Sequence, residues 1–73
     1  MPVHNRLKYW RHQLKIEEQL EFARLLDVNP WYIERWEEQK IQPSLETFCK
    51  IRDRLKRVLP EITLDDLIDY FPD

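Results

Sequence analysis

Side chains suited to catalysis or metal binding are few and scattered in this chain. The only histidines are His4 and His12, and the only cysteine is Cys49. A structural zinc site takes four ligands and a catalytic one three, so this set does not predict a metal site. Neither histidine has a nucleophile or a paired acid beside it in the sequence, which makes an enzyme the weakest interpretation. We therefore expect no catalytic residue, no metal, no cofactor and no small-molecule ligand.

Charge is distributed in alternating blocks along the sequence. The formal net charge is −2, which by itself would argue against a polyanionic partner. Residues 1–15 nevertheless carry four basic and no acidic side chains, and residues 44–57 carry a net charge of +3. Residues 16–43 and 58–73 are acidic, with net charges of −4 and −5. Net charge therefore does not exclude binding to nucleic acid.

Length and composition predict a small globular protein. A chain of 73 residues has room for one hydrophobic core, so residues 1–73 are expected to form a single domain. Hydrophobic residues make up 42% of the chain, which is too much apolar material for a disordered protein. No apolar run reaches the roughly 20 residues that cross a bilayer, and the first residues lack the apolar stretch of a signal peptide. We expect a cytoplasmic protein with no membrane contact.

The first half of the sequence predicts three helices. The chain has no glycine, and its five prolines stand where helices could start or end. Leu7, Trp10 and Leu14 are spaced for one side of a helix over residues 5–15 that Asn5 would cap. A second helix of about eight residues starts at Gln19. Asn followed by Pro at positions 29 and 30 is a helix start signal, and it predicts a third helix after a sharp turn.

The second half predicts two more helices. Ser44 is expected to cap a fourth helix, whose apolar stripe keeps its phase as far as Leu59 before Pro60 ends it. Thr63 and Asp66 have the spacing of a capping box and predict a short fifth helix. No segment shows the period-two alternation of a strand. The prediction is an all-α fold, a compact bundle of five helices.

The middle of the chain resembles a known family. Its residues form the pattern Gln19, Phe22, Ala23, Leu26, Val28, Asn29, Ile33, Trp36 and Glu37, followed by Pro43, Ser44, Leu45 and Glu46. This pattern resembles the XRE family, which includes phage repressors and Cro proteins. The resemblance extends over about residues 5–70, with the helix-turn-helix proper at about 19–38. It implies a lambda-repressor-like helix-turn-helix domain.

The resemblance implies a partner and a set of contacts. The third helix would lie in the major groove of double-stranded DNA, and the start of the second helix would lie on a phosphate. The side chains it implies in DNA binding are Gln19 on a phosphate, Asn29 as cap and backbone contact, Trp31, Tyr32 and Arg35 as base readers, and Lys40 and Gln42 as further backbone contacts. Arg35 matches the two acceptors of guanine, and the aromatic rings could pack on thymine methyl groups.

Two charged residues would hold these helices together. The resemblance implies an ion pair between Arg11 in the first helix and Glu37 at the end of the third. When such a pair is buried, it fixes the relative position of the two helices more than it stabilises the fold. The alternative is that both are ordinary surface charges. Ala23, Phe22 and Ile33 are expected in the core where the helices cross.

These patterns favour a sequence-specific DNA-binding regulator that occupies an operator. It would act as a homodimer with apolar contacts near the C-terminus. The candidates for these contacts are Leu59, Ile62, Tyr70 and Phe71. The alternative is a protein-interaction module on the same fold, such as an antitoxin or anti-repressor. Trp31 and Tyr32 would then form a protein-binding surface, and Arg35 would pair with a nearby glutamate. Four acidic side chains close to the expected DNA face keep this alternative open: Glu17, Glu18, Glu34 and Glu38.

Overall fold

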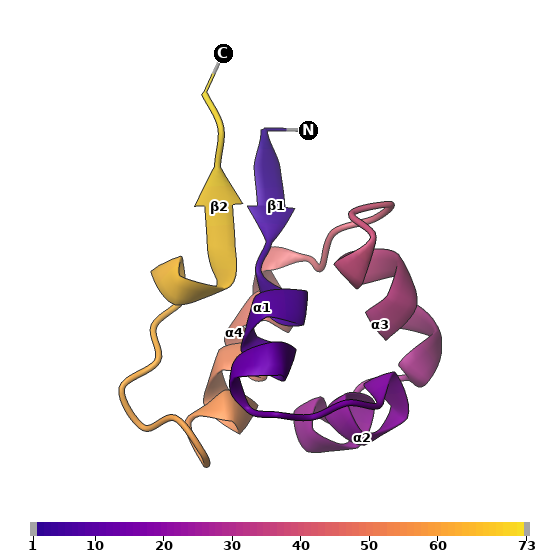
Figure 1. Ribbon diagram of the computed structural model, residues 1–73. Helices are drawn as coiled ribbons and strands as arrows, with labels where there is room; N and C mark the ends of the chain where they lie inside the picture. Colours follow the sequence, from indigo (N-terminus) through magenta and orange to yellow (C-terminus); the bar gives the residue numbers. More distant parts are fainter. Residues whose placement is uncertain (1, 73) are drawn as a thin grey trace.

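Four α-helices and a small sheet make up residues 2–72, the part of the chain that the computed structural model describes (Figure 1). The helices form a small body, and the two strands lie side by side and project from it (Figure 1). In chain order the elements are β1 (Val3–Asn5), α1 (Leu7–Gln13), α2 (Gln19–Leu26), α3 (Pro30–Glu37), α4 (Leu45–Leu55), a 3-10 turn (Asp65–Leu67) and β2 (Ile68–Tyr70).

Local side-chain caps explain where α3 and α4 begin. The Asn29 side chain accepts a hydrogen bond from the Trp31 amide at 2.9 Å, and Pro30 occupies the first position of α3. The Ser44 hydroxyl accepts from the Thr47 amide at 3.1 Å at the start of α4. Both caps satisfy amides that have no partner inside the helix. The predicted starts of these two helices are therefore confirmed.

The prediction that the chain has no strand is wrong. β1 pairs antiparallel with β2, with Val3 opposite Tyr70 and Asn5 opposite Ile68. α1 consequently begins at Leu7, later than predicted, although the Asn5 side chain still accepts from the Leu7 amide at 3.2 Å. A strand of three residues is too short to produce a visible alternation, so only its pairing with a distant segment reveals it.

The predicted five-helix bundle is also wrong, because four α-helices are present in residues 2–72. α4 ends at Leu55 instead of continuing to Leu59, and the chain then turns through residues 56–58. The capping box near the C-terminus does form, since the Thr63 amide donates to the Asp66 carboxylate at 2.9 Å. It supports only a 3-10 turn, because from Ile68 the backbone is extended and pairs with β1.

One cluster of buried side chains joins the helices. α2 contributes Phe22, Ala23 and Leu26, and α3 contributes Ile33 and Trp36. The remaining members come from α1, from α4 and from the segment after α4: Leu7, Phe48, Ile51, Leu55, Ile62 and Leu67. Ala23 is 1% exposed in this cluster, and its small side chain lets α2 pack closely there. The core thus buries the inner sides of both α2 and α3.

Three helices end in the left-handed conformation without glycine. Lys15, Asp27 and Gln39 have φ values of 58°, 57° and 61° just after α1, α2 and α3. In each case the next amide bonds back to the helix, for example Val28 N to Ala23 O at 3.0 Å. This arrangement is the Schellman motif, in which glycine is the usual residue because it has no Cβ to clash.

Replacing Asp27 with glycine should therefore stabilise the fold. We expect Asp27→Gly to raise the free energy of unfolding by up to about 1 kcal/mol, since it removes the steric cost of the left-handed residue. Thermal and urea unfolding followed by circular dichroism measure the change. Gln39→Gly is the matched control and should instead destabilise the fold, because it removes the Gln39 side-chain amide. That amide accepts from the Asn5 backbone N–H and donates to the Asn5 carbonyl. Equal effects at both positions would contradict this interpretation.

Candidate nucleic-acid interface

α2 and α3 form a helix pair joined by residues 27–29. α3 lies at one side of the molecule (Figure 1). Its inner side is buried through Ile33, Trp36 and Glu37. Its other side is open to solvent, with Trp31 53% and Tyr32 42% exposed. An exposed helix held firmly by its inner side has the form needed to enter a groove of DNA.

Arg11 and Glu37 form a buried ion pair beneath this helix pair. Arg11 Nε and Nη2 donate to the two carboxylate oxygens of Glu37 at 2.7 and 2.9 Å, a bidentate arrangement. Arg11 Nη1 also donates to the carbonyls of Ile16 and Glu17. The hydrogen bond to Glu37 raises the pKa of Arg11, and the attraction of the two charges adds to this, while burial lowers it. The pair ties α1 and the chain entering α2 to the end of α3.

Gln19 extends this network to the first turn of α2. Its Nε2 donates to Glu37 Oε1 at 3.1 Å, so one of its two amide protons is used inside the protein. The side chain is half-buried and keeps one N–H and its oxygen for another partner. The structure therefore places Gln19 at the start of α2, where its orientation depends on the buried ion pair.

Arg35 and Trp31 lie against each other on the exposed side of α3. The Arg35 guanidinium carbon is 3.6 Å from the centre of a Trp31 ring, and Arg35 Nη1 donates to the Trp31 carbonyl at 2.8 Å. Within residues 2–72, Arg35 forms no ion pair with Glu34 or Glu38. The alternative pairing of Arg35 with a neighbouring glutamate is thus absent from these residues, and Arg35 forms a cation–π stack with Trp31.

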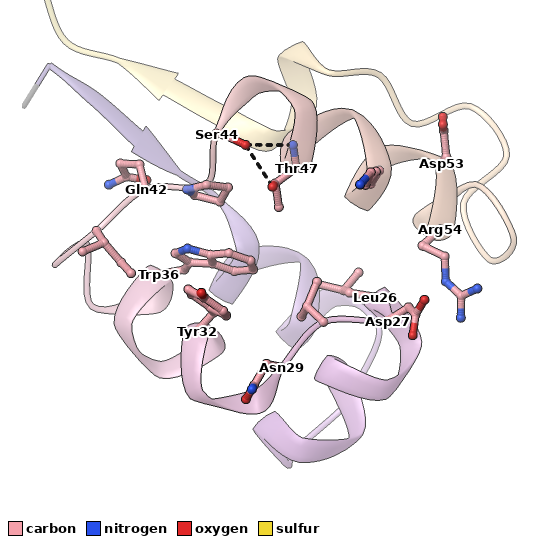
Figure 2. A pocket seen from close by; sticks show the side chains of 14 residues that line it. Leu26, Asp27, Asn29, Tyr32, Trp36, Gln42, Ser44, Thr47, Asp53 and Arg54 are labelled. Atoms are coloured by element: carbon pink, nitrogen blue, oxygen red, sulfur yellow. Dashed lines mark hydrogen bonds between the residues drawn. The ribbon is translucent and has the colours of Figure 1, made fainter.

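Tyr32 lies beside this stack, and the Trp31 and Tyr32 rings meet edge-on with their centroids 5.0 Å apart. Its ring is stacked on Trp36, with centroids 5.4 Å apart, and both rings line a groove between α3 and α4 (Figure 2). The groove has a volume of about 600 Å³, and Ser44 and Thr47 from the start of α4 lie on its other side (Figure 2). The structure therefore brings the three predicted base readers into contact, with Trp31 between Arg35 and Tyr32, and Tyr32 also lines this groove.

The loop after α3 is held by a network that the sequence analysis missed. The buried Asn5 side chain donates to the Trp36 carbonyl at 2.6 Å and to Gln42 Oε1 at 2.8 Å. Gln42 Nε2 donates in turn to Gln39 Oε1 at 2.8 Å, and Gln39 also bonds the Asn5 backbone. Gln42 therefore keeps one N–H for an outside partner. Asn5 was interpreted only as a helix cap, and its distant partners could not be found from local spacing.

Charge on this side of the molecule is mixed. Lys40 is exposed and lies 2.9 Å from the Glu38 carboxylate, and Arg35 is engaged by Trp31. In the described part of the chain, four exposed carboxylates of α2, α3 and the segment before α2 have no cation within 4.0 Å: Glu17, Glu18, Glu21 and Glu34. Few positive charges are therefore free to neutralise phosphates here.

Comparison with known families decides the classification. A family model described as Helix-turn-helix matches residues 7–62, from the first residue of α1 to the segment beyond α4. The chain belongs to the XRE-type helix-turn-helix family. This family consists of DNA-binding regulatory domains, and the matched residues include both α2 and α3. Comparisons with curated proteins and with solved structures gave no match.

Among the described residues, no helix combines the length and the apolar character required to cross a bilayer. Within the same residues, no three His, Cys, Asp or Glu side chains are grouped in a way that could hold a metal ion.

Proposed function

We propose that this protein is a sequence-specific transcriptional regulator that acts in the cytoplasm by occupying an operator through α3. The observation that carries the proposal is the position of Trp31 and Arg35. They are stacked on the exposed side of a helix whose inner side is held by the core and by the Arg11–Glu37 pair. A rigid helix with a multidentate donor on its open side suits readout of base edges in the major groove.

Contacts to the sugar-phosphate backbone would surround α3. Gln19 at the start of α2 and Asn29 at the start of α3 lie at helix N-termini, where backbone amides and the helix dipole favour an anion. Lys40 and Gln42 in the loop after α3 would add contacts on the other side. These contacts set the position of the protein on the duplex and leave sequence discrimination to α3.

A homodimer on two half-sites fits this mode of binding. Tyr70 and Phe71 are 64% and 54% exposed at the end of β2, and Leu59 is half-buried beyond α4. Ile62 is 5% exposed and belongs to the core, so among the four candidates it has the least surface to offer a second copy. We propose that the two aromatic side chains provide the apolar contact.

Selection of duplexes from a random pool, followed by fluorescence anisotropy, tests the proposal. The wild type should enrich one sequence, Arg35→Ala should lose preference at one base position, and Gln19→Ala should weaken binding to all sequences. Because Lys40 is the one cation among the proposed backbone contacts, log K should fall with log[salt] with a slope of about −1 per protomer. Arg57→Ala, beyond the end of α4, removes the same charge as a control. Affinity no higher than nonspecific at low salt would contradict the proposal.

A protein partner is the second candidate. The observation that favours it is the set of exposed carboxylates without cation partners, together with the exposed Trp31 and Tyr32. A basic protein surface would complement these charges, whereas a phosphate backbone would be repelled. Replacing Glu17, Glu18 and Glu34 by glutamine distinguishes the two candidates. The triple variant should bind DNA more tightly if DNA is the partner, and should lose binding if the partner is a basic protein.

A further inference from the structure

We propose that Trp31 and Arg35 act as one unit that recognises a single guanine through its major-groove edge. In this unit Arg35 contacts the base, and Trp31 is a positioning residue that does not read a base itself. The inference rests on the proposed function, because it names what the open side of α3 recognises. It also changes the expected role of Trp31, for which the resemblance implies a base reader that packs on a thymine methyl group or forms a hydrogen bond.

Two contacts of different kinds hold the Arg35 guanidinium. The stack on the Trp31 ring at 3.6 Å fixes the plane of the guanidinium, and the hydrogen bond from Nη1 to the Trp31 carbonyl at 2.8 Å fixes one of its corners. An arginine side chain normally loses much rotamer freedom on binding a partner. Here Trp31 supplies both contacts before any ligand arrives, so the donor edge is already oriented.

The remaining edge of Arg35 is the one that a two-acceptor partner would use. Arg11 provides a comparison within the same chain, because its Nη1 donates to backbone carbonyls while Nε and Nη2 bind the carboxylate of Glu37. Arg35 repeats the first half of this pattern with the Trp31 carbonyl. In residues 2–72, no acceptor bonds to its Nε or Nη2. The free edge presents two coplanar donors.

Three partners carry two acceptors at the right spacing, namely guanine, a phosphate and a carboxylate. Guanine is favoured by the charges around Arg35. Glu34 precedes it on α3 and Glu38 follows three residues later, and both are exposed. Glu34 has no cation within 4.0 Å among the residues described, so an incoming anion would meet repulsion that the neutral O6 and N7 of guanine avoid. The free edge of Arg35 therefore matches a base better than a phosphate.

The test uses the selected duplex with each guanine replaced in turn, by adenine, by 7-deazaguanine or by inosine. For the wild type, one position should lose affinity about 10- to 100-fold with adenine or 7-deazaguanine. Inosine keeps O6 and N7 and should leave affinity unchanged. Trp31→Leu keeps apolar bulk without a ring face and should reduce this discrimination to under about 3-fold, as should Arg35→Lys, which lacks the fork. Trp31→Phe restores a ring and should recover most of it.

Readouts other than base discrimination separate a positioning role from a structural one. The unfolding midpoint and the affinity for nonspecific DNA should be the same for Trp31→Leu and Trp31→Phe. Unchanged guanine preference in Trp31→Leu would overturn the inference, and so would a lost preference at a different base, since Trp31 would then itself be a reader. A loss that is equal for all duplexes would assign Arg35 to a phosphate and overturn it as well.

A measurement without DNA keeps this inference distinct from the proposed function. The Arg35 Hε resonance of the free protein should be shifted upfield by the Trp31 ring current and should return to its ordinary position in Trp31→Leu. If that shift is present and no duplex is bound specifically, the proposed function fails and the guanine assignment fails with it. If duplexes are bound specifically and the shift is absent, the proposed function stands and the role of Trp31 is overturned.

Discussion

Glu37→Ala is expected to lower the free energy of unfolding by about 3–5 kcal/mol, because it leaves the Arg11 guanidinium buried without its charge partner. The carboxylate of Glu37 accepts from Arg11 Nε and Nη2 and from Gln19 Nε2, so three donors lose their acceptor at once. In a domain of this size such a loss is a large part of the total stability. Urea unfolding followed by tryptophan fluorescence measures it.

Two control variants show whether the loss of stability in Glu37→Ala comes from the buried ion pair. Glu38→Ala removes the neighbouring exposed carboxylate, which pairs only with Lys40 at the surface, and should cost under about 1 kcal/mol. The double variant Arg11→Met with Glu37→Leu removes both charges and should recover most of the stability lost in Glu37→Ala. If Glu37→Ala costs no more than Glu38→Ala, the pair is not the tie between α1 and α3 that its geometry indicates.

The second large effect is expected at Asn5. Asn5→Ala removes the two Nδ2 protons that are shared among the Trp36 carbonyl and the side-chain oxygens of Gln39 and Gln42, and it removes the acceptor of the Leu7 amide. Since Asn5 is 4% exposed, water cannot replace all of these partners, and we expect a loss of about 2–3 kcal/mol. Hydrogen exchange should become faster in residues 38–43, because the loop after α3 loses its bonds to the Asn5 side chain and keeps only those between Gln39 and the Asn5 backbone.

Asn29→Ala is the matched control for Asn5→Ala. The substitution is the same, but the Asn29 side chain makes one exposed hydrogen bond, to the Trp31 amide, and its loss should cost about 1 kcal/mol. Faster exchange should then be confined to the first turn of α3. Similar losses of stability at both positions, or an unchanged loop in Asn5→Ala, would show that the Asn5 network does not hold the loop.

Local signals were sufficient where a helix is defined by its own residues. Gln19–Leu26 follows from apolar spacing, and the starts of α3 and α4 follow from Asn29 and Ser44, because a cap satisfies amides only two or three residues away. At the C-terminus the helical periodicity gave a wrong prediction, because the conformation there depends on a distant segment of the chain. The pattern after Thr63 is compatible with a helix, and only the availability of β1 as a partner turns Ile68–Tyr70 into a strand.

The candidate site shows the same division. The sequence identified α3 as the exposed helix and placed Trp31, Tyr32 and Arg35 on it, and the resemblance paired Arg11 with Glu37. The sequence could not show that Tyr32 lines the groove with Trp36 or that Arg35 stacks on Trp31. Nor could it show that the Gln19 and Gln42 side chains form hydrogen bonds within the protein. Gln19 and Gln42 take their directions from partners on other elements, Glu37 and Asn5. The two contacts within α3 depend on which rotamers neighbours four residues apart adopt.

By itself, then, the sequence determined the helix-turn-helix and its caps, because these depend on backbone preferences and on contacts within a few residues. The tertiary structure alone decided the sheet between the two ends of the chain, the Asn5 network and the direction of each polar side chain. The sheet and the bonds of the Asn5 side chain to the loop after α3 join residues more than 30 positions apart, as Asn5 and Gln42 are. Their partners come together only after the core has formed, so nothing in the local spacing could specify them.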